Sequence, residues 1–247
     1  MTIFEKYAGL KTSTDARGWR WYGTEEQPWL YPSVSTIQKE TIPNRGLEEY
    51  YKNNPAKKIA DNLEKAGTFG TDAHSFFEQI IQTRVLDGGI PDTHQAHCKA
   101  FLEWVLKHDV KPIQQEFAVV SERYGYAGRV DALAEVDGEV ELLDWKTGNE
   151  YSDSWASQCG AYQLALTEML GQANDSIGIR VLQIKRADAT LKEFKFQHLD
   201  FIQDSFLLCL DRFKRAPNFN YLKKLGWKWV MEKAMIRNQL GGQNGSV

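Results

Sequence analysis

The stretch that decides the fold reads GRVDALAEV-DG-EVELLDWK over residues 128–146. Its outer runs alternate apolar and polar residues, and Asp137-Gly138 between them is a strong signal for a two-residue β-turn. With such a turn, pairing continued back along the hairpin sets Asp131 opposite Asp144. Side chains paired across antiparallel strands have Cβ atoms about 4.5–5.5 Å apart. The sequence therefore predicts two carboxylates side by side on one hairpin.

Two carboxylates this close repel each other unless a cation lies between them, and their oxygens suit a divalent metal. Lys146 extends from the same face as Asp144, because strand side chains repeat every second residue. Two acidic ligands beside an ammonium group suit metal-assisted attack of water on a phosphodiester. The alternative is that both aspartates are solvated on an exposed face. Apolar neighbours such as Leu133 and Trp145 argue against it, because charges in apolar strands need partners.

Composition limits the classes of protein that remain. The chain has 247 residues, 42% of them hydrophobic, and a net charge of −3, so contacts with nucleic acid must come from local basic patches. Its three cysteines form no CxxC pair, which argues against zinc, an iron–sulfur cluster and a disulfide framework. The sequence shows no apolar signal core and no run of about 18 apolar residues. We therefore expect a soluble protein of the cytoplasm without membrane contact.

The order of predicted elements indicates one α/β domain, with a central mixed β-sheet flanked by helices and a mostly helical N-terminal part. We expect it to span residues 1–240, with a flexible tail over 241–247. Its parts are an aromatic arm or short hairpin and helices over 1–110, the core sheet and helices over 111–215, and a C-terminal helix over 216–240. The periodicity predicts helices at 44–65, 71–86, 92–109, 152–170, 200–214 and 219–238, and strands at 113–120, 177–186 and 191–199.

Other positions carry groups that bind metal ions or substrate. His74 lies on a predicted helix with Glu78 one turn later, and the pair is either a surface pair or part of a metal site. Glu116 is an acid within an apolar strand, so we count it among the catalytic candidates, although a solvated strand residue is an equal alternative. Gln158 and Tyr162, four residues apart on a helix, can together position a phosphate, a base or water.

In their order and spacing these residues resemble the RecB-like branch of the PD-(D/E)xK nuclease superfamily. The shared positions are His74, Asp131 in GRVD, Asp144 to Lys146 in DWK, and Gln158 and Tyr162 in QxxxY. The segments PSVSTI (32–37) and AGTFGTDAHSFFE (66–78) are similar to those of mitochondrial genome maintenance exonucleases and related phage exonucleases. Val130 replaces the proline of the superfamily name, and the four cysteines of iron–sulfur members are absent.

The resemblance implies a restriction-endonuclease-like core that uses Mg²⁺ or Mn²⁺ and carries no iron–sulfur cluster. By that likeness the metal ligands are His74, Asp131, Asp144 and the backbone carbonyl of Trp145. Lys146 positions the nucleophilic water or stabilises developing negative charge, while Gln158 and Tyr162 support the catalytic site and the substrate.

We therefore expect a metal-dependent DNA exonuclease that hydrolyses phosphodiester bonds from DNA ends and favours single strands. By the resemblance, we expect it to act in phage or bacterial DNA replication, recombination or repair, in the cytoplasm of a bacterial host cell. A protein of one of those processes is an expected partner. One alternative is a structure-specific or restriction-like endonuclease, which would also cut a circular strand. Another is a non-catalytic nucleic-acid-binding accessory protein, which need not retain the histidine, both aspartates and the lysine together.

Substrate contacts are expected at both ends of the chain. Arg20 and Trp21, with Arg129 beside the hairpin, can contact phosphates or stack on bases, although most N-terminal aromatic rings are expected to belong to the core. The segment 211–238 is the most basic and aromatic part of the chain. Its candidates are Lys223, Lys224 and Lys228, and the alternative is an ordinary solvated helix face.

Overall fold

The central hairpin has the register that the sequence predicts. In the computed structural model, β5 (Tyr126–Val136) and β6 (Glu139–Lys146) pair antiparallel, and the last paired residues before the two aspartates are Ala132 and Leu143. The two residues of the turn have φ values of 54° and 90°. A tight type I′ turn requires such left-handed values, which explains the Asp-Gly sequence.

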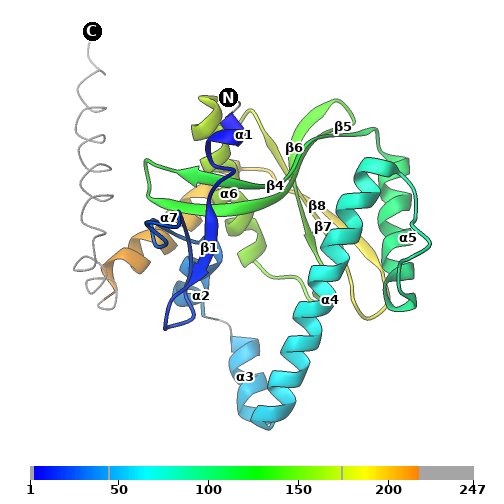
Figure 1. Ribbon diagram of the computed structural model, residues 1–247, viewed down its shortest axis with the longest axis horizontal. Coiled ribbons are helices and arrows are strands. Elements are labelled where there is room, and N and C mark those ends of the chain that lie inside the picture. The colour runs from blue at the N-terminus through cyan, green and yellow to red at the C-terminus, as the bar shows by residue number, and fades with distance from the viewer. Residues whose placement is uncertain (1–2, 44, 174, 217–247) are drawn as a thin grey trace.

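Five strands form the central mixed sheet, in the order β4-β5-β6-β7-β8 (Figure 1). β4 (Val110–Ser121) is antiparallel to β5, whereas β7 (Gly178–Ile184) runs parallel to β6 and β8 (Leu191–Lys195) returns antiparallel to β7. The parallel step needs a long crossover, which α6 (Ser154–Leu170) supplies. The expected fold class, a mixed sheet flanked by helices, is therefore confirmed.

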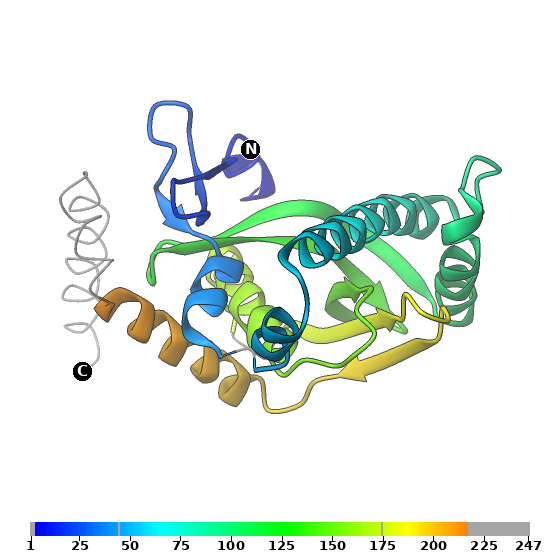
Figure 2. The same cartoon turned by 90° about the horizontal axis from the view of Figure 1, so that it is seen from below.

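One face of the sheet packs against α4 (Ala56–Thr83) and α5 (Asp92–Lys107), as Figures 1 and 2 show. Phe77 of α4 stacks on Phe101 of α5 with ring centroids 4.5 Å apart, and both rings meet Trp145 of β6 edge-on. This aromatic contact fixes the long helix α4 across the sheet.

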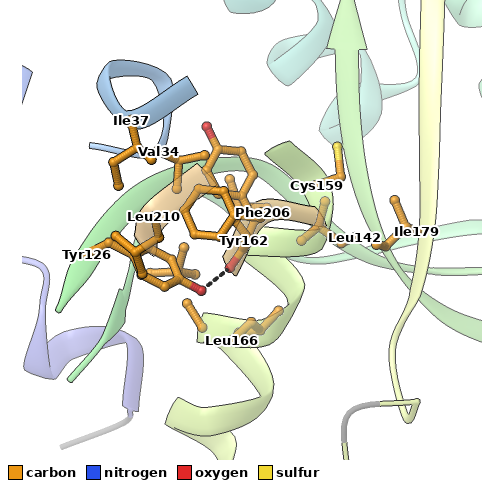
Figure 3. Packing of buried hydrophobic residues seen from close by; sticks show 14 of the residues in the cluster. Val34, Ile37, Tyr126, Leu142, Cys159, Tyr162, Leu166, Ile179, Phe206 and Leu210 are labelled. Atoms are coloured by element: carbon orange, nitrogen blue, oxygen red, sulfur yellow. Dashed lines mark hydrogen bonds between the residues drawn. The ribbon is translucent and has the colours of Figure 1, made fainter. Parts of the chain in front are cut away.

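The opposite face packs against α6, α7 (Leu199–Arg215) and α2 (Val34–Thr41). In the core drawn in Figure 3, Tyr126 packs against Phe206 with ring centroids 4.8 Å apart. The Tyr126 hydroxyl donates to the Ala161 carbonyl at 2.8 Å, so this buried phenol is satisfied. The packing holds α6, which carries two candidate site residues, against the sheet.

The long strands β4 and β5 contribute to both cores. On β5, Val130 belongs to the core beneath α6, whereas Ala132 belongs to the core beneath α4 and α5. Within β4, Glu116 has a φ of 45°, a value that residues other than glycine rarely adopt. Such outliers cluster at functional sites because the surrounding structure must hold them in place.

The N-terminal segment forms a small sheet of its own instead of an arm or a single hairpin. β1 (Lys11–Thr14), β2 (Arg20–Gly23) and β3 (Tyr31–Pro32) pair antiparallel in that order. A bridge between Ser33 and Ala127 joins the end of this sheet to β5. The N-terminal sheet is thereby attached beside the central hairpin.

The expected helices at 44–65 and 71–86 are wrong in their boundaries. The chain forms α3 (Arg45–Asn53) and then the single long α4, with the break at Pro55. Proline disfavours helical conformation in the residue before it, so the first helix ends there. The two glycines of the AGTFG stretch lie inside α4, where tertiary packing outweighs their low helix propensity.

The structure describes residues 3–43, 45–173 and 175–216, beginning with the short helix α1 (Ile3–Lys6). The expected C-terminal helix and tail lie almost entirely outside these ranges. No helix within them is long and apolar enough to cross a bilayer. The division of the chain into one domain with three parts stays a prediction.

Candidate active site

A cavity of about 250 Å³ lies where β4, β5 and β6 meet α2, α4, α6 and the N-terminal sheet. It gathers nearly all the side chains that the sequence singles out for chemistry. The expected residues that line it are Glu116, Asp131, Asp144, Lys146, Gln158 and Tyr162, with His74 on α4 and the two arginines at positions 20 and 129.

Glu116, Asp131 and Asp144 occupy one row across three neighbouring strands. The registers of β4 with β5 and of β5 with β6 place Asp131 between the other two acids. The paired residues of the hairpin end just before the two aspartates. Beyond that point, the backbone N–H of Trp145 donates to Asp131 Oδ2 at 2.9 Å. The Asp131 side chain therefore ties β5 to β6 where the regular ladder stops.

His74 completes a group of candidate metal ligands. Its Nδ1 atom lies 3.6 Å from Asp131 Oδ1. One ligand atom from each of His74, Glu116 and Asp131 lies within 4.8 Å of the others. An imidazole nitrogen and two carboxylates at this spacing can bind a divalent cation.

This group contains Glu116, which the sequence counted among the catalytic candidates, in addition to the expected ligands His74 and Asp131, and the ligand role of Asp144 stays a prediction. Asp144 lines the same cavity but lies 2.5 Å from the Lys146 ammonium, in an ion pair through Oδ2. That buried oxygen accepts no hydrogen bond of good geometry from the described residues. Trp145 is absent from the cavity lining, so the ligand role of its carbonyl stays a prediction.

The pKa values of the acids show how crowded the negative charge is. Burial, together with the charges of Asp131 and Glu78, raises the pKa of Glu116 to about 7. Burial also raises the pKa of Asp144 to about 6, with Asp131 adding to the rise and Lys146 opposing it. A nearby cation would favour the ionised form of these carboxylates and lower their pKa values. The donor set and its charge therefore fit a bound divalent metal.

His74 and Asp131 favour each other's charged forms. Burial is the largest influence on Asp131 and opposes its ionisation, but the interactions with His74, the charge of Lys146 and the Trp145 N–H together outweigh it and lower the Asp131 pKa. Burial is also the largest influence on His74 and disfavours its imidazolium, but the interactions with Asp131 and the charge of Asp144 together outweigh it and raise the His74 pKa. A metal ligand must be neutral imidazole, so protons and metal compete for His74.

Gln158 and Tyr162 form one unit on the wall supplied by α6. Gln158 Nε2 donates to the Tyr162 hydroxyl at 2.9 Å. Burial raises the pKa of Tyr162 well above its usual value of 10, so the phenol keeps its proton and can donate a hydrogen bond. Gly128 of β5 packs so closely against the Tyr162 ring that a Cβ atom there would overlap it. Because residue 128 is a glycine, the Tyr162 ring can lie in this position.

The expected contact of Trp21 with substrate is wrong. Its side chain is fully buried, and its indole N–H donates to Asp15 at 3.1 Å. The ring belongs to the core next to Trp19, because the small N-terminal sheet needs large apolar side chains to pack. Lys223, Lys224 and Lys228 lie outside the described residues, so their role stays a prediction.

Sequence reasoning did not single out five lining residues, Tyr22, Ser33, Val34, Ser35 and Gly128. Ser33, Val34 and Ser35 lie in the PSVSTI segment at 32–37, and Gly128 begins the GRVD stretch, so both motifs of the resemblance contained a signal. The signal for Tyr22 was its place among the N-terminal aromatic and arginine residues.

A family model described as "PD-(D/E)XK nuclease superfamily" matches residues 47–214, a range that contains every acid of the cavity together with His74 and Lys146. No curated protein matches the chain.

Proposed function

The chain belongs to the PD-(D/E)XK nuclease superfamily, and from this premise we propose that it is a metal-dependent DNA exonuclease of the RecB-like branch that favours single strands. The observation that carries the proposal is the convergence of Glu116, Asp131, Asp144 and Lys146 in one cavity with His74. A protein that only bound nucleic acid would need no such crowding of acids, which weakens binding to a polyanion.

The residues fit a divalent cation, and Mg²⁺ or Mn²⁺ is the proposed one. His74, Glu116 and Asp131 would hold it, with Asp144 at the next position of the row. When bound, such an ion polarises a phosphoryl oxygen and lowers the pKa of coordinated water. The Asp131 carboxylate is preorganised for this by its bond to the Trp145 N–H.

Lys146 supplies the positive charge that this chemistry needs beside the acids. Its ammonium is held 2.5 Å from Asp144 Oδ2, and although burial is the largest single influence, the interactions with Asp144 and the charge of Asp131 together outweigh it and raise the Lys146 pKa. Lys146 therefore stays protonated at neutral pH. Its proposed role is to orient the attacking water or to stabilise negative charge on the phosphate, a form of electrostatic catalysis.

Gln158 and Tyr162 are proposed to hold the substrate on the α6 side. The Tyr162 hydroxyl keeps its proton and accepts from Gln158, which leaves its own O–H to donate toward the cavity. A phosphate oxygen or the attacking water is a suitable acceptor.

The preference for single strands is supported by how the cavity is enclosed. Its lining comes from the N-terminal sheet, α2, α4 and α6 as well as from the central strands, and Asp131 and Asp144 are buried within it. One strand with splayed bases reaches such buried acids more readily than a duplex. Action in phage or bacterial replication, recombination or repair follows from the resemblance and belongs to the same proposal.

The test is a digestion of single-stranded DNA in Mg²⁺ with three substrates: a 5′-labelled strand, a 3′-labelled strand and a circle. We expect stepwise loss of nucleotides from one labelled end and an intact circle. Cutting of the circle would show an endonuclease instead. No cutting of any substrate, with Mg²⁺ or Mn²⁺, would overturn the proposed activity.

A further inference from the structure

Three cations line the cavity, and they differ in exposure. Lys146 is half-buried and paired with Asp144. Arg20 of β2 and Arg129 of β5 are exposed. The metal site proposed above gives these two arginines no role.

The backbone of Arg20 is fixed by three hydrogen bonds to the start of α2. The Ser33 N–H donates to the Arg20 carbonyl at 3.0 Å. Thr36 Oγ1 accepts from the Arg20 N–H at 2.8 Å and donates to the Arg20 carbonyl at 3.2 Å. The guanidinium itself forms no ion pair with a carboxylate of the described residues. The structure thus fixes the backbone of a residue that brings an unneutralised cation to the lining of an acidic site.

Arg129 lines the same cavity and is held by contacts with Glu116. Its Nη1 donates to the Glu116 carbonyl at 2.8 Å and lies 3.7 Å from a carboxylate oxygen of Glu116. Tyr22 lies near both arginines: burial raises the pKa of its phenol, and the charges of Arg129 and Arg20 oppose that rise. Two guanidinium groups and one phenol from two separate sheets therefore face one volume.

The charge of the cavity indicates what fills that volume. Three carboxylates and three permanently charged bases line it, so they balance each other. A divalent cation would add two positive charges. One phosphodiester carries one negative charge, so a single scissile phosphate leaves the filled site positive, and a second phosphate restores the balance. The arginines are the groups placed to bind it: Arg20 has no ion pair among the described residues and Arg129 lies 3.7 Å from the Glu116 carboxylate, whereas Lys146 lies 2.5 Å from Asp144.

We propose that Arg20, Tyr22 and Arg129 form a second phosphate subsite, which holds the phosphate next to the scissile one in the same strand. This inference rests on the proposed function, since it assumes that a phosphodiester lies over the acids. Arg20 and Tyr22 come from the N-terminal sheet, which lies outside the range that the family model matches. The N-terminal sheet is then part of the substrate site as well as a support for the fold.

The test measures binding of the full chain to a short single-stranded oligonucleotide by fluorescence anisotropy, with Ca²⁺ in place of Mg²⁺ to limit cleavage. Each linkage in turn is replaced by a neutral methylphosphonate. Arg20→Ala should weaken binding to the unmodified strand and lower the log–log salt slope by about 0.7, the loss of one phosphate contact. At one linkage the methylphosphonate should remove this difference between wild type and variant.

The control is Arg123→Ala, the same change of charge at an exposed position outside the cavity lining. It should leave binding and slope unchanged. Arg20→Gln, which keeps most of the side chain, should repeat the effect of Arg20→Ala, and circular dichroism should show both variants folded. Strands with and without a terminal phosphate show whether the bound group is a terminal monoester or an internal diester.

The subsite is overturned if Arg20→Ala changes nothing, or if it weakens binding equally with every methylphosphonate strand. The test of the subsite does not depend on whether the proposed nuclease activity is found. A protein that shows the position-specific loss but cuts no DNA keeps the subsite and loses the nuclease function. A protein that cuts DNA without that loss keeps the function and loses the subsite.

Discussion

The carboxylate of Asp131 accepts a hydrogen bond from the backbone N–H of Trp145 at 2.9 Å, across the two strands of the central hairpin. One side chain therefore has two tasks, because Asp131 also faces His74 at 3.6 Å within the candidate metal group. The bond occupies Oδ2 and orients Oδ1 toward the imidazole. Structural support and ligand geometry are coupled at this residue.

That coupling predicts different results for two substitutions of Asp131. Asp131→Ala leaves the buried Trp145 N–H without its acceptor and should cost about 1–3 kcal/mol of unfolding free energy. Asp131→Asn keeps an acceptor oxygen and should retain most of the stability, yet both variants should lose activity with the charge. Urea unfolding monitored by tryptophan fluorescence measures the difference. Equal stability of the two variants would contradict the bond's structural role.

The raised pKa of Glu116 predicts how stability depends on pH when no metal is bound. Its pKa is about 7 in the folded protein against a usual 4.5. An acid whose pKa rises on folding binds protons more tightly in the folded state, so its stabilisation is complete below the unfolded value and is lost as pH rises through the folded one. In chelator, the temperature at the midpoint of thermal unfolding should therefore decrease as the pH is raised from about 5 to about 8.

Glu116→Gln should make that pH profile flatter, because the neutral amide does not titrate. The control Glu64→Gln, at an exposed position of α4, should keep the profile of the wild type. Raised pKa values at Asp144 and His74 act in the same direction, so some slope should remain. A Glu116→Gln profile as steep as that of the wild type would show that this acid is not crowded as described.

Lys146→Ala should lower the turnover number by about 100-fold or more, the range of a lost electrostatic contact in a transition state. Divalent metal binding should hold or strengthen, since a positive charge beside Asp144 is gone. Single-turnover kinetics and a calorimetric metal titration separate the two effects. Loss of metal binding in this variant would reject the catalytic role and give Lys146 a structural one.

Gly128→Ala should reduce activity although position 128 carries no functional group. The added methyl overlaps the Tyr162 ring and displaces its hydroxyl together with Gln158. Gly67→Ala is the control, since the structure leaves open space around position 67 and alanine favours a helix. Replacing Tyr162 by leucine in the Gly128→Ala background should relieve the overlap without restoring activity. A fully active Gly128→Ala variant would mean that the phenol's position is unimportant.

The hairpin and its acids were predictable because they depend on local signals. The Asp137-Gly138 turn determines the pairing, and the pairing determines which side chains face each other. Pro55 carried a local signal too, and it divides α3 from α4 where the periodicity alone suggested one helix. Most of the central sheet follows from such short-range features.

The placement of Glu116 and Tyr22 was not predictable in the same way. Glu116 joins His74 and Asp131 at a residue of β4 with positive φ, and no sequence rule identifies a glutamate as the residue that adopts it. Tyr22 reaches the cavity because an N-terminal sheet attaches to β5 through Ser33 and Ala127, a contact between segments distant in sequence. Trp21, its neighbour, faces the opposite way and is buried.

We propose that His74, Glu116 and Asp131 hold a divalent cation and that the protein uses this cation to cleave DNA. The most direct measurement follows release of nucleotides from an end-labelled single strand by wild type and Asp131→Asn, each with Mg²⁺ and with chelator. We expect the wild type to cleave only when metal is present, and we expect a folded Asp131→Asn variant to cleave at a rate at least about 100-fold lower. Equal rates for the two proteins, or undiminished cleavage in chelator, would contradict this proposal.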